Sequence, residues 1–338
     1  MGVDSLGLGH DNDMMEPQLS FEGPNKPIKI CGGGNFTALL QEDGSLYLAG
    51  DVPLERSSSD DNWIQVRGLF KDVSCGWSHV VAITSEDIVV SGGVGEKGEL
   101  GQLDTRHSLS LQPIWTLQNP REAQVFACFY NTYVLDDGKL YGCGSNSKSQ
   151  LKESKSRAIC SLTIVSAGPV SHACVGKNFV CFVEKGQARV MGTMAQYEAE
   201  LRNIMSENTN FEFNSMWTSI VVLLHQKFYF YGQASQKQDV VAVHSFNEPA
   251  TAWSTGSEHG MVCIDKREVY CWGWGEHGNC GSIATSRAIN GVNDKSNVNS
   301  EVNSVYKVTA SDSIVYACFG GCATSWICTA TSESETCK

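Results

Sequence analysis

Residues 30–51 read ICGGGNFTALLQEDGSLYLAGD, which is a glycine-rich turn, an apolar strand, an Asp-Gly tight turn and a second strand. The unit recurs most clearly as SCGWSHVVAI at 74–83, ACFYNTYVLDDGKLYGCGSN at 127–146 and TGSEHGMVCIDKREVYCWGWGEHGNCG at 255–281. Weaker copies lie at 174–192, 216–232 and 318–328. The spacings between the seven turns are 43, 53, 47, 41, 39 and 65 residues, counted from Gly32, Cys75, Cys128, Val175, Met216, Thr255 and Gly320.

Strand-rich repeats of this period are typical of β-propellers. One such sheet cannot bury both of its faces, but seven sheets arranged radially can, and the closed ring leaves only short edges. The sequence therefore predicts an all-β fold, a closed seven-bladed β-propeller that forms a single domain over residues 1–328.

The composition argues against a nucleic-acid-binding, membrane-spanning or secreted protein. The 338 residues carry a net charge of −12, which argues against direct binding to nucleic acid, because a surface that follows phosphates needs clustered Lys and Arg. No apolar run approaches the roughly 20 residues that cross a bilayer. The start, MGVDSLGLGHDND, lacks the basic and apolar regions of a secretory signal. We expect a cytoplasmic or nuclear protein whose 14 cysteines, with no CxxC pair, stay reduced.

Three segments depart from the repeat. Residues 193–209 predict a short amphipathic helix that packs on a blade, because apolar residues recur at helical spacing at Met194, Tyr197, Leu201, Ile204 and Met205. Residues 282–304 are rich in Ser and Asn, which predicts an exposed, flexible insertion. Residues 329–338 are predicted to be a polar tail.

Motifs for chemistry are weak. GVGEKG at 93–98 and GWGEHG at 273–278 match the glycine pattern of a dinucleotide site, but no helix is predicted to open at their last glycine. We interpret both as a structural signature of the repeat. The sequence contains no GxSxG, HExxH or Walker motif. We therefore expect a protein that is not an enzyme and has no catalytic residue or cofactor.

Two Glu-His pairs, Glu258-His259 and Glu276-His277, form the densest polar constellation. Three interpretations remain open for them. They could bind a transition metal with nearby cysteines, although no known ligand spacing is present and we expect no metal. They could instead make hydrogen bonds within blade turns. They could also form a recognition surface with neighbouring tryptophans. The nearby residues are Cys263, Cys271, Cys280, Trp253, Trp272 and Trp274.

The repeat resembles a known superfamily. CGWSHVVAI, the blade ending GxLYxxG and the loop GEKGELG are similar to repeats of the regulator-of-chromosome-condensation propellers. Four stretches, LGLGHDNDM at 6–14, MWTSI at 216–220, the segment 255–281 and FGGCATSWI at 319–327, resemble more closely the fungal killer-toxin-insensitivity propeller, also described as an alpha-tubulin suppressor.

That resemblance implies a non-catalytic regulatory or scaffold subunit. The implied partner is the small CSL-type zinc- or iron-binding protein of diphthamide synthesis, with which the family forms a heterodimer. The complex supports diphthamide synthesis on translation elongation factor two and, through the Elongator complex, modification of wobble uridines in transfer RNA. The alternative is a guanine-nucleotide exchange factor for a small GTPase, an activity found in the wider superfamily.

Carried over to this sequence, the resemblance places partner-binding residues at Glu258, His259, Trp274, Glu276, His277, Asn279, Cys280, Cys322 and Trp326. For Trp326, which lies in an apolar strand, a packing role is the alternative. Family members also carry an aromatic-Ala-Phe-Gly strand before the first loop, whereas Met1 begins inside that loop. We therefore expect either a closing blade that is one strand short or a natural start upstream of Met1.

Overall fold

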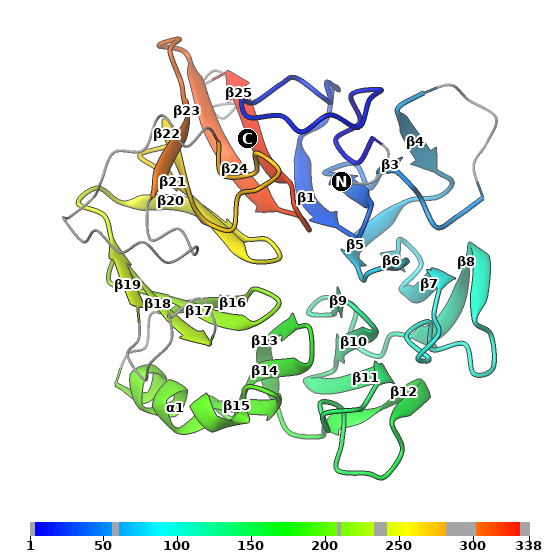
Figure 1. The fold of residues 1–338 in the computed structure, drawn as a ribbon. Coiled ribbons are helices and arrows are strands. Elements are labelled where there is room, and N and C mark those ends of the chain that lie inside the picture. The colour runs from blue at the N-terminus through cyan, green and yellow to red at the C-terminus, as the bar shows by residue number, and fades with distance from the viewer. Residues whose placement is uncertain (1–3, 56–60, 208–210, 233–241, 282–301, 332–338) are drawn as a thin grey trace.

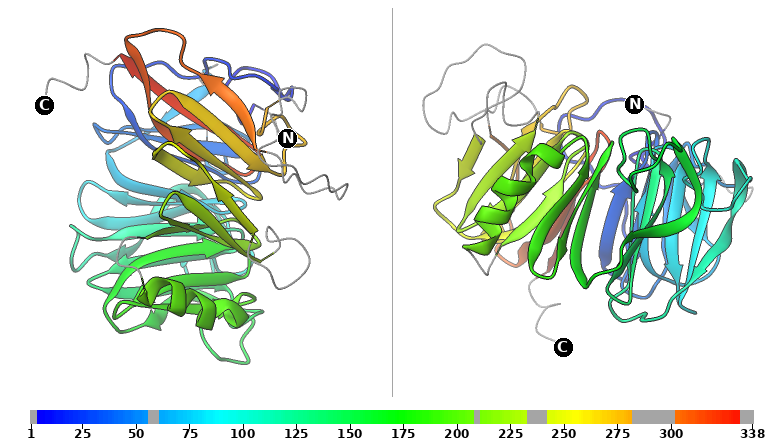
Figure 2. Two further views of the ribbon diagram at one scale, coloured as in Figure 1. Left: turned by 90° about the vertical axis from the view of Figure 1, so that its left-hand side faces the viewer. Right: turned by 90° about the horizontal axis from the view of Figure 1, so that it is seen from below.

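The structure is a computed structural model that describes residues 4–55, 61–207, 211–232, 242–281 and 302–331. Its strands form antiparallel sheets that follow one another around a central axis, so that the last sheet lies beside the first (Figure 1). The strands run roughly along that axis when the ring is seen from the side (Figure 2). The predicted β-propeller is confirmed.

Each sheet is built from consecutive segments of the chain. The first two sheets hold β1 (Pro27–Gly32), β2 (Phe36–Gln41), β3 (Leu46–Gly50) and β4 (Trp63–Val66), then β5 (Phe70–Cys75), β6 (His79–Thr84), β7 (Ile88–Val94) and β8 (His107–Thr116). The third and fourth hold β9 (Gln124–Cys128), β10 (Asn131–Asp136), β11 (Lys139–Ser145) and β12 (Ala158–Ser166), then β13 (Val170–Gly176), β14 (Phe179–Glu184) and β15 (Gln187–Gly192). The last three hold β16 (Glu212–Ser215), β17 (Ser219–Leu224), β18 (Lys227–Gly232) and β19 (Ala242–Ser245), then β20 (Ala250–Thr255), β21 (His259–Ile264), β22 (Glu268–Gly273) and β23 (Asn303–Lys307), and finally β24 (Ser313–Gly320) and β25 (Ser325–Thr331).

The prediction of seven blades is wrong, because the structure, over the residues it describes, has six. Among the described residues, six sheets have three or four strands, and the seventh is only the antiparallel pair β24–β25. Residues 4–26 lie against β25, yet they contain no strand that could extend the pair. The sequence predicts either a closing blade that is one strand short or a natural start upstream of Met1, and the described residues give this last sheet two strands.

A glycine with positive φ is the last or next-to-last residue of the third strand in every sheet that has one. At Gly144, φ is 107° and an added Cβ would lie 2.1 Å from the carbonyl oxygen of Tyr130. Only glycine tolerates both the backbone conformation and the close approach. GVGEKG begins at the corresponding Gly93, and turns rather than a helix follow it. The absence of a helix after Gly98 agrees with the interpretation of GVGEKG as a structural feature of the repeat and not as a dinucleotide site. The six glycines are Gly50, Gly93, Gly144, Gly192, Gly232 and Gly273.

The hydrophobic core lies between neighbouring sheets. The second strands β2 and β10 are buried along their whole length, since successive side chains point to opposite faces and each face packs on a different neighbour. In β6, for example, Val80 and Ala82 pack with the first sheet, whereas Val81 and Ile83 pack with the third. Both faces are therefore apolar, which explains why these strands read as continuous apolar runs.

A helix takes the place of a fourth strand in the fourth sheet. The 3-10 turn η1 (Ala195–Tyr197) and α1 (Glu198–Ser206) lie on the outer side of β15, within the range predicted to be helical (Figure 1). Leu201 and Met205 are buried against the sheet. Neither helical segment of the described chain has the length and apolar character needed to cross a bilayer.

The two remaining segment predictions concern residues 282–304 and 329–338. Most of the predicted Ser/Asn-rich insertion, 282–301, lies outside the described residues. The predicted polar tail starts at residue 329, and its first three residues belong to β25, which pairs with β24 as far as Thr331.

Candidate protein-binding face

The innermost strands of all seven sheets surround a central cavity of about 510 Å³. One end of this cavity is bounded by the turns that join each innermost strand to the second strand of its sheet, and we call these the axial turns. Because every repeat places this turn next to the axis, residues far apart in the sequence meet there. The innermost strands are β1, β5, β9, β13, β16, β20 and β24.

Main-chain hydrogen bonds tie the axial turns to one another. The amide of Trp77 donates to the carbonyl of Phe129 at 2.9 Å, and the amide of Trp217 donates to that of Ser257 at 2.6 Å. The same pattern continues with Gly34 to Trp77 (2.8 Å), Lys177 to Trp217 (2.8 Å) and Ser257 to Gly321 (3.0 Å). These bonds hold the turns in a fixed arrangement that is independent of their side chains.

Four aromatic side chains from three sheets gather on the axial turns. We call Trp77, Phe129, Tyr130 and Trp217 the aromatic cluster. The rings of Trp77 and Phe129 are stacked with centroids 5.1 Å apart, and the edge-to-face pair Phe129–Trp217 is at 4.5 Å. Trp77 and Tyr130 are each 38% exposed, although large apolar side chains are usually buried. The rings of the aromatic cluster thus pack against one another and remain partly exposed to solvent.

Charged groups border the aromatic cluster. The Lys177 ammonium lies 4.3 Å from the centre of the Phe129 ring, a cation–π contact. Next to Trp217 in the sequence, Thr218 donates a hydrogen bond of 2.9 Å to the carboxylate of Glu258. Burial raises the pKa of Glu258, although that hydrogen bond and Lys177 oppose the effect. An aromatic centre with a polar border is the usual composition of a protein–protein interface.

Four of the residues predicted to bind a partner are buried. His259 is 0% exposed, and Asn279, Cys280 and Trp326 are 6%, 2% and 8% exposed. Their side chains offer little surface to a partner in this conformation, and we assign them to packing. For Trp326 this is the alternative that its apolar strand already suggested.

His259 has a clear structural role. It begins β21, and its Nε2 shares a hydrogen bond of 3.1 Å with the hydroxyl of Ser325 in the next sheet. His79 begins β6 in the same way and pairs with Thr132 at 2.8 Å. Burial lowers the pKa of each imidazole to about 4, so both are neutral at physiological pH. Neither Nδ1 has a hydrogen-bond partner among the described residues.

The other five predicted residues divide between two places. Glu258 and Cys322 belong to the axial turns, and Cys322 also lines the central cavity. Trp274, Glu276 and His277 lie in the loop after β22, where Nδ1 of His277 is 3.0 Å from the carboxylate of Asp13. The two Glu-His pairs therefore have different environments. Within the described residues, no three His, Cys, Asp or Glu side chains gather as metal ligands.

Sequence reasoning missed the aromatic cluster and Lys177. A usable signal was present, because Trp77 and Trp217 each stand one residue after the start of an axial turn, at the position that Ser257 and Cys322 occupy in their own repeats. Aligning the repeats on that turn would have placed both tryptophans in the same column, which predicts that both lie at the axis.

Comparison with known proteins supports the same fold. No family profile matches the chain. The chain is 26% identical to the RCC1 repeat-containing protein C10F6.04 of Schizosaccharomyces pombe, over 81% of this chain and 85% of that protein. It is 29% identical to the ultraviolet-B receptor UVR8 of Arabidopsis thaliana, over 43% of this chain and 36% of the receptor. Human WBSCR16 has a similar structure, with a TM-score of 0.71, 15% identity and coverage of 98% and 96% of the two chains.

Proposed function

We propose that this chain, a propeller of the RCC1-repeat superfamily, is a non-catalytic subunit that binds a protein partner through its axial turns. The observation that carries the proposal is the partly exposed aromatic cluster on the axis, held by main-chain bonds between sheets. Rigid aromatic anchors lose little entropy when they bind, and Trp and Tyr are enriched in interface hot spots.

The partner that we propose is the small zinc- or iron-binding protein of diphthamide synthesis. Support comes from where the closest family resemblance lies, since 216–220, 255–281 and 319–327 each contain an axial turn. These turns carry Trp217, Glu258 and Cys322. In this proposal the propeller acts in diphthamide synthesis and in Elongator-dependent modification of transfer RNA only through that partner.

The test is a titration of the purified chain with the small partner protein. Replacing Trp217 with Ala removes an anchor at the centre of the face, and we expect affinity to fall by about 2–4 kcal/mol, or roughly 30- to 1,000-fold. Leu109→Ala is the matched control, because Leu109 is 66% exposed on β8, the outermost strand of its sheet. It should leave the affinity unchanged.

Two results would contradict the proposal. The first is unchanged affinity for a Trp217→Ala variant whose thermal transition matches that of the parent. The second is faster nucleotide release from a small GTPase in the presence of the chain, with no binding to the metal-binding partner. That result would favour the exchange-factor alternative.

A further inference from the structure

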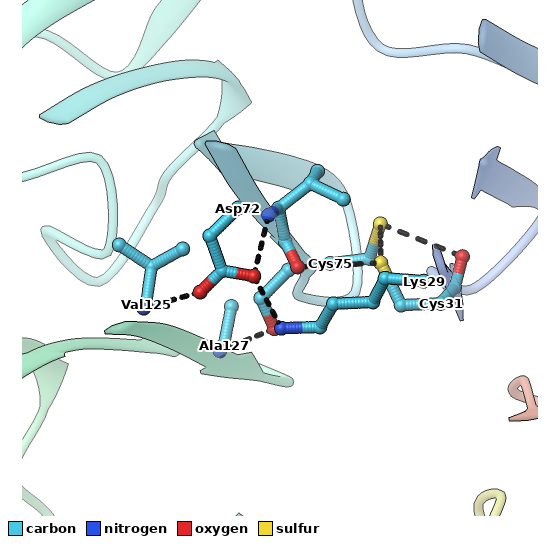
Figure 3. Close-up of polar contacts among 8 residues, drawn as sticks. Lys29, Cys31, Asp72, Cys75, Val125 and Ala127 are labelled. Carbon is cyan, nitrogen blue, oxygen red and sulfur yellow. Dashed lines mark hydrogen bonds and ion pairs between the residues drawn. The ribbon is translucent and has the colours of Figure 1, made fainter. Parts of the chain in front are cut away.

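Two cysteines from different sheets meet beside the central cavity. Cys31 of β1 and Cys75 of β5 have their Sγ atoms 3.2 Å apart (Figure 3). A disulfide bond measures about 2.05 Å, so the two sulfurs need to approach by only about 1 Å to be joined. The pair is therefore close enough for a bond, although the two strands belong to separate blades.

A polar network fixes the strands that carry this pair. The Lys29 ammonium lies 2.7 Å from one carboxylate oxygen of Asp72, and the other oxygen accepts a hydrogen bond of 2.9 Å from the amide of Val125 (Figure 3). The network joins β1, β5 and β9, which belong to three sheets. Because these strands cannot easily slide past one another, the two thiols stay in register.

The two thiols differ in access. Both cysteines line the central cavity, but Cys31 is only half-buried. A small oxidant can reach Cys31 through the cavity. Cys75 is only 5% exposed, and burial, together with its hydrogen bond to Cys31, raises its pKa well above the usual range.

Lys29 places a positive charge beside both sulfurs. Burial lowers the pKa of Lys29, but Asp72 and the two neighbouring thiols outweigh it and the pKa is raised overall, so the ammonium stays charged. Thiols react with peroxides as thiolates. Of the two cysteines, Cys31 is the more exposed and is the one that an oxidant meets first.

We propose that Cys31 and Cys75 are a peroxide-sensitive pair that closes a disulfide between the first and second sheets. The Cys31 thiolate attacks one oxygen of hydrogen peroxide, the O–O bond breaks, and hydroxide leaves and becomes water. The sulfur of Cys75 then attacks the Cys31 sulfenic acid, the S–S bond forms, the S–O bond breaks, and the proton of Cys75 leaves in a second water. The two cysteines lose two electrons, and the peroxide gains them.

A second cysteine pair provides a matched comparison. Cys174 of β13 and Cys181 of β14 lie opposite each other in one sheet. They are 3% and 0% exposed, so an oxidant has little access to either. We expect Cys31–Cys75 to oxidise first, although both pairs bring two thiols together.

Mass spectrometry can test this directly in the full chain. The reduced protein is treated with limiting hydrogen peroxide, remaining thiols are alkylated, and the chain is digested with trypsin. The expected product joins the peptides 30–56 and 72–97, each of which contains a single cysteine, with the loss of two hydrogens. Dithiothreitol should separate them. If these peptides stay unlinked while 178–185, which carries Cys181, becomes linked, the proposal is wrong.

A variant separates the two steps. In Cys75→Ser the sulfenic acid at Cys31 has no thiol to attack it, and dimedone should label Cys31 after peroxide treatment. In the parent chain this label should fall at least about tenfold, because the disulfide forms instead. Labelling that is equal in the two proteins, or absent from Cys31 in the folded variant, would overturn the proposal.

Discussion

Lowering the pH should unfold this propeller through two buried histidines. His79 and His259 are each 0% exposed, and each has a pKa of about 4 in the folded chain, compared with 6.5 when it is solvated. A group whose pKa is lowered on folding contributes its stability above the unfolded pKa. That contribution disappears as the pH falls from 6.5 through 4, because the unfolded chain binds the proton more readily.

The size of the effect follows from the two pKa values. The difference between 6.5 and about 4 corresponds to about 3.4 kcal/mol per imidazole at the acid limit, and to about 2 kcal/mol between pH 8 and pH 5. Both histidines together should therefore cost about 4 kcal/mol at pH 5. That is a large part of the 5–15 kcal/mol that stabilises a typical domain.

Urea unfolding followed by tryptophan fluorescence at pH 8 and pH 5 measures this loss. Glutamine keeps a hydrogen-bonding side chain but cannot be protonated, so the double variant His79→Gln, His259→Gln should lose about 4 kcal/mol less than the parent between the two pH values. His277→Gln is the control and should lose as much as the parent, since both buried histidines remain. A double variant with the full acid loss would refute the reasoning.

Three further predictions test the fold and the absence of a metal. Gly144→Ala should destabilise the chain by about 3–5 kcal/mol. Gly186→Ala is the control and should cost only about 1 kcal/mol, because Gly186 has φ 75° but no atom lies within 4 Å of its added Cβ. Equal losses of stability in thermal melting would contradict the clash at Gly144. Asp136→Asn should reduce the free energy of unfolding by about 2–4 kcal/mol, because the buried Asp136 carboxylate accepts hydrogen bonds from the Trp115 ring and the amides of Gln118 and Asn119. Asp137 is exposed, so Asp137→Asn should change the free energy of unfolding in urea by less than about 0.5 kcal/mol. Chelator treatment should leave the melting temperature unchanged, and elemental analysis that finds about one zinc or iron per chain afterwards would show that this expectation is wrong.

The propeller could be predicted from the sequence because each blade repeats a turn and an apolar strand at a similar spacing. The number of blades could not, because the copy at 318–328 has the turn and two strands but, within the residues that the structure describes, no third strand. The positive-φ glycine at or next to the end of each third strand marks the difference. Gly273 is the last of the six, and none follows in the β24–β25 pair.

The binding residues were harder to predict, because similar dipeptides occupy different positions in the repeat. Glu258-His259 stands at the start of a second strand, where His259 turns into the core as His79 does. Glu276-His277 stands in a loop after a third strand, close to Asp13. Proximity in sequence suggested one site, whereas position within the repeat decides which side chain is buried.

The aromatic cluster exists only because the ring closes. Trp77, Phe129 and Trp217 come from three sheets, and the bonds that fix their turns involve main-chain amides and carbonyls. A substitution at Trp217 removes a ring from the face but keeps those bonds, so binding can be lost while the fold is retained. His259 is the opposite case, because its side chain itself joins two sheets through Ser325. Loss of binding after a change at His259 would therefore report on folding, and only the tryptophan variants can locate the interface.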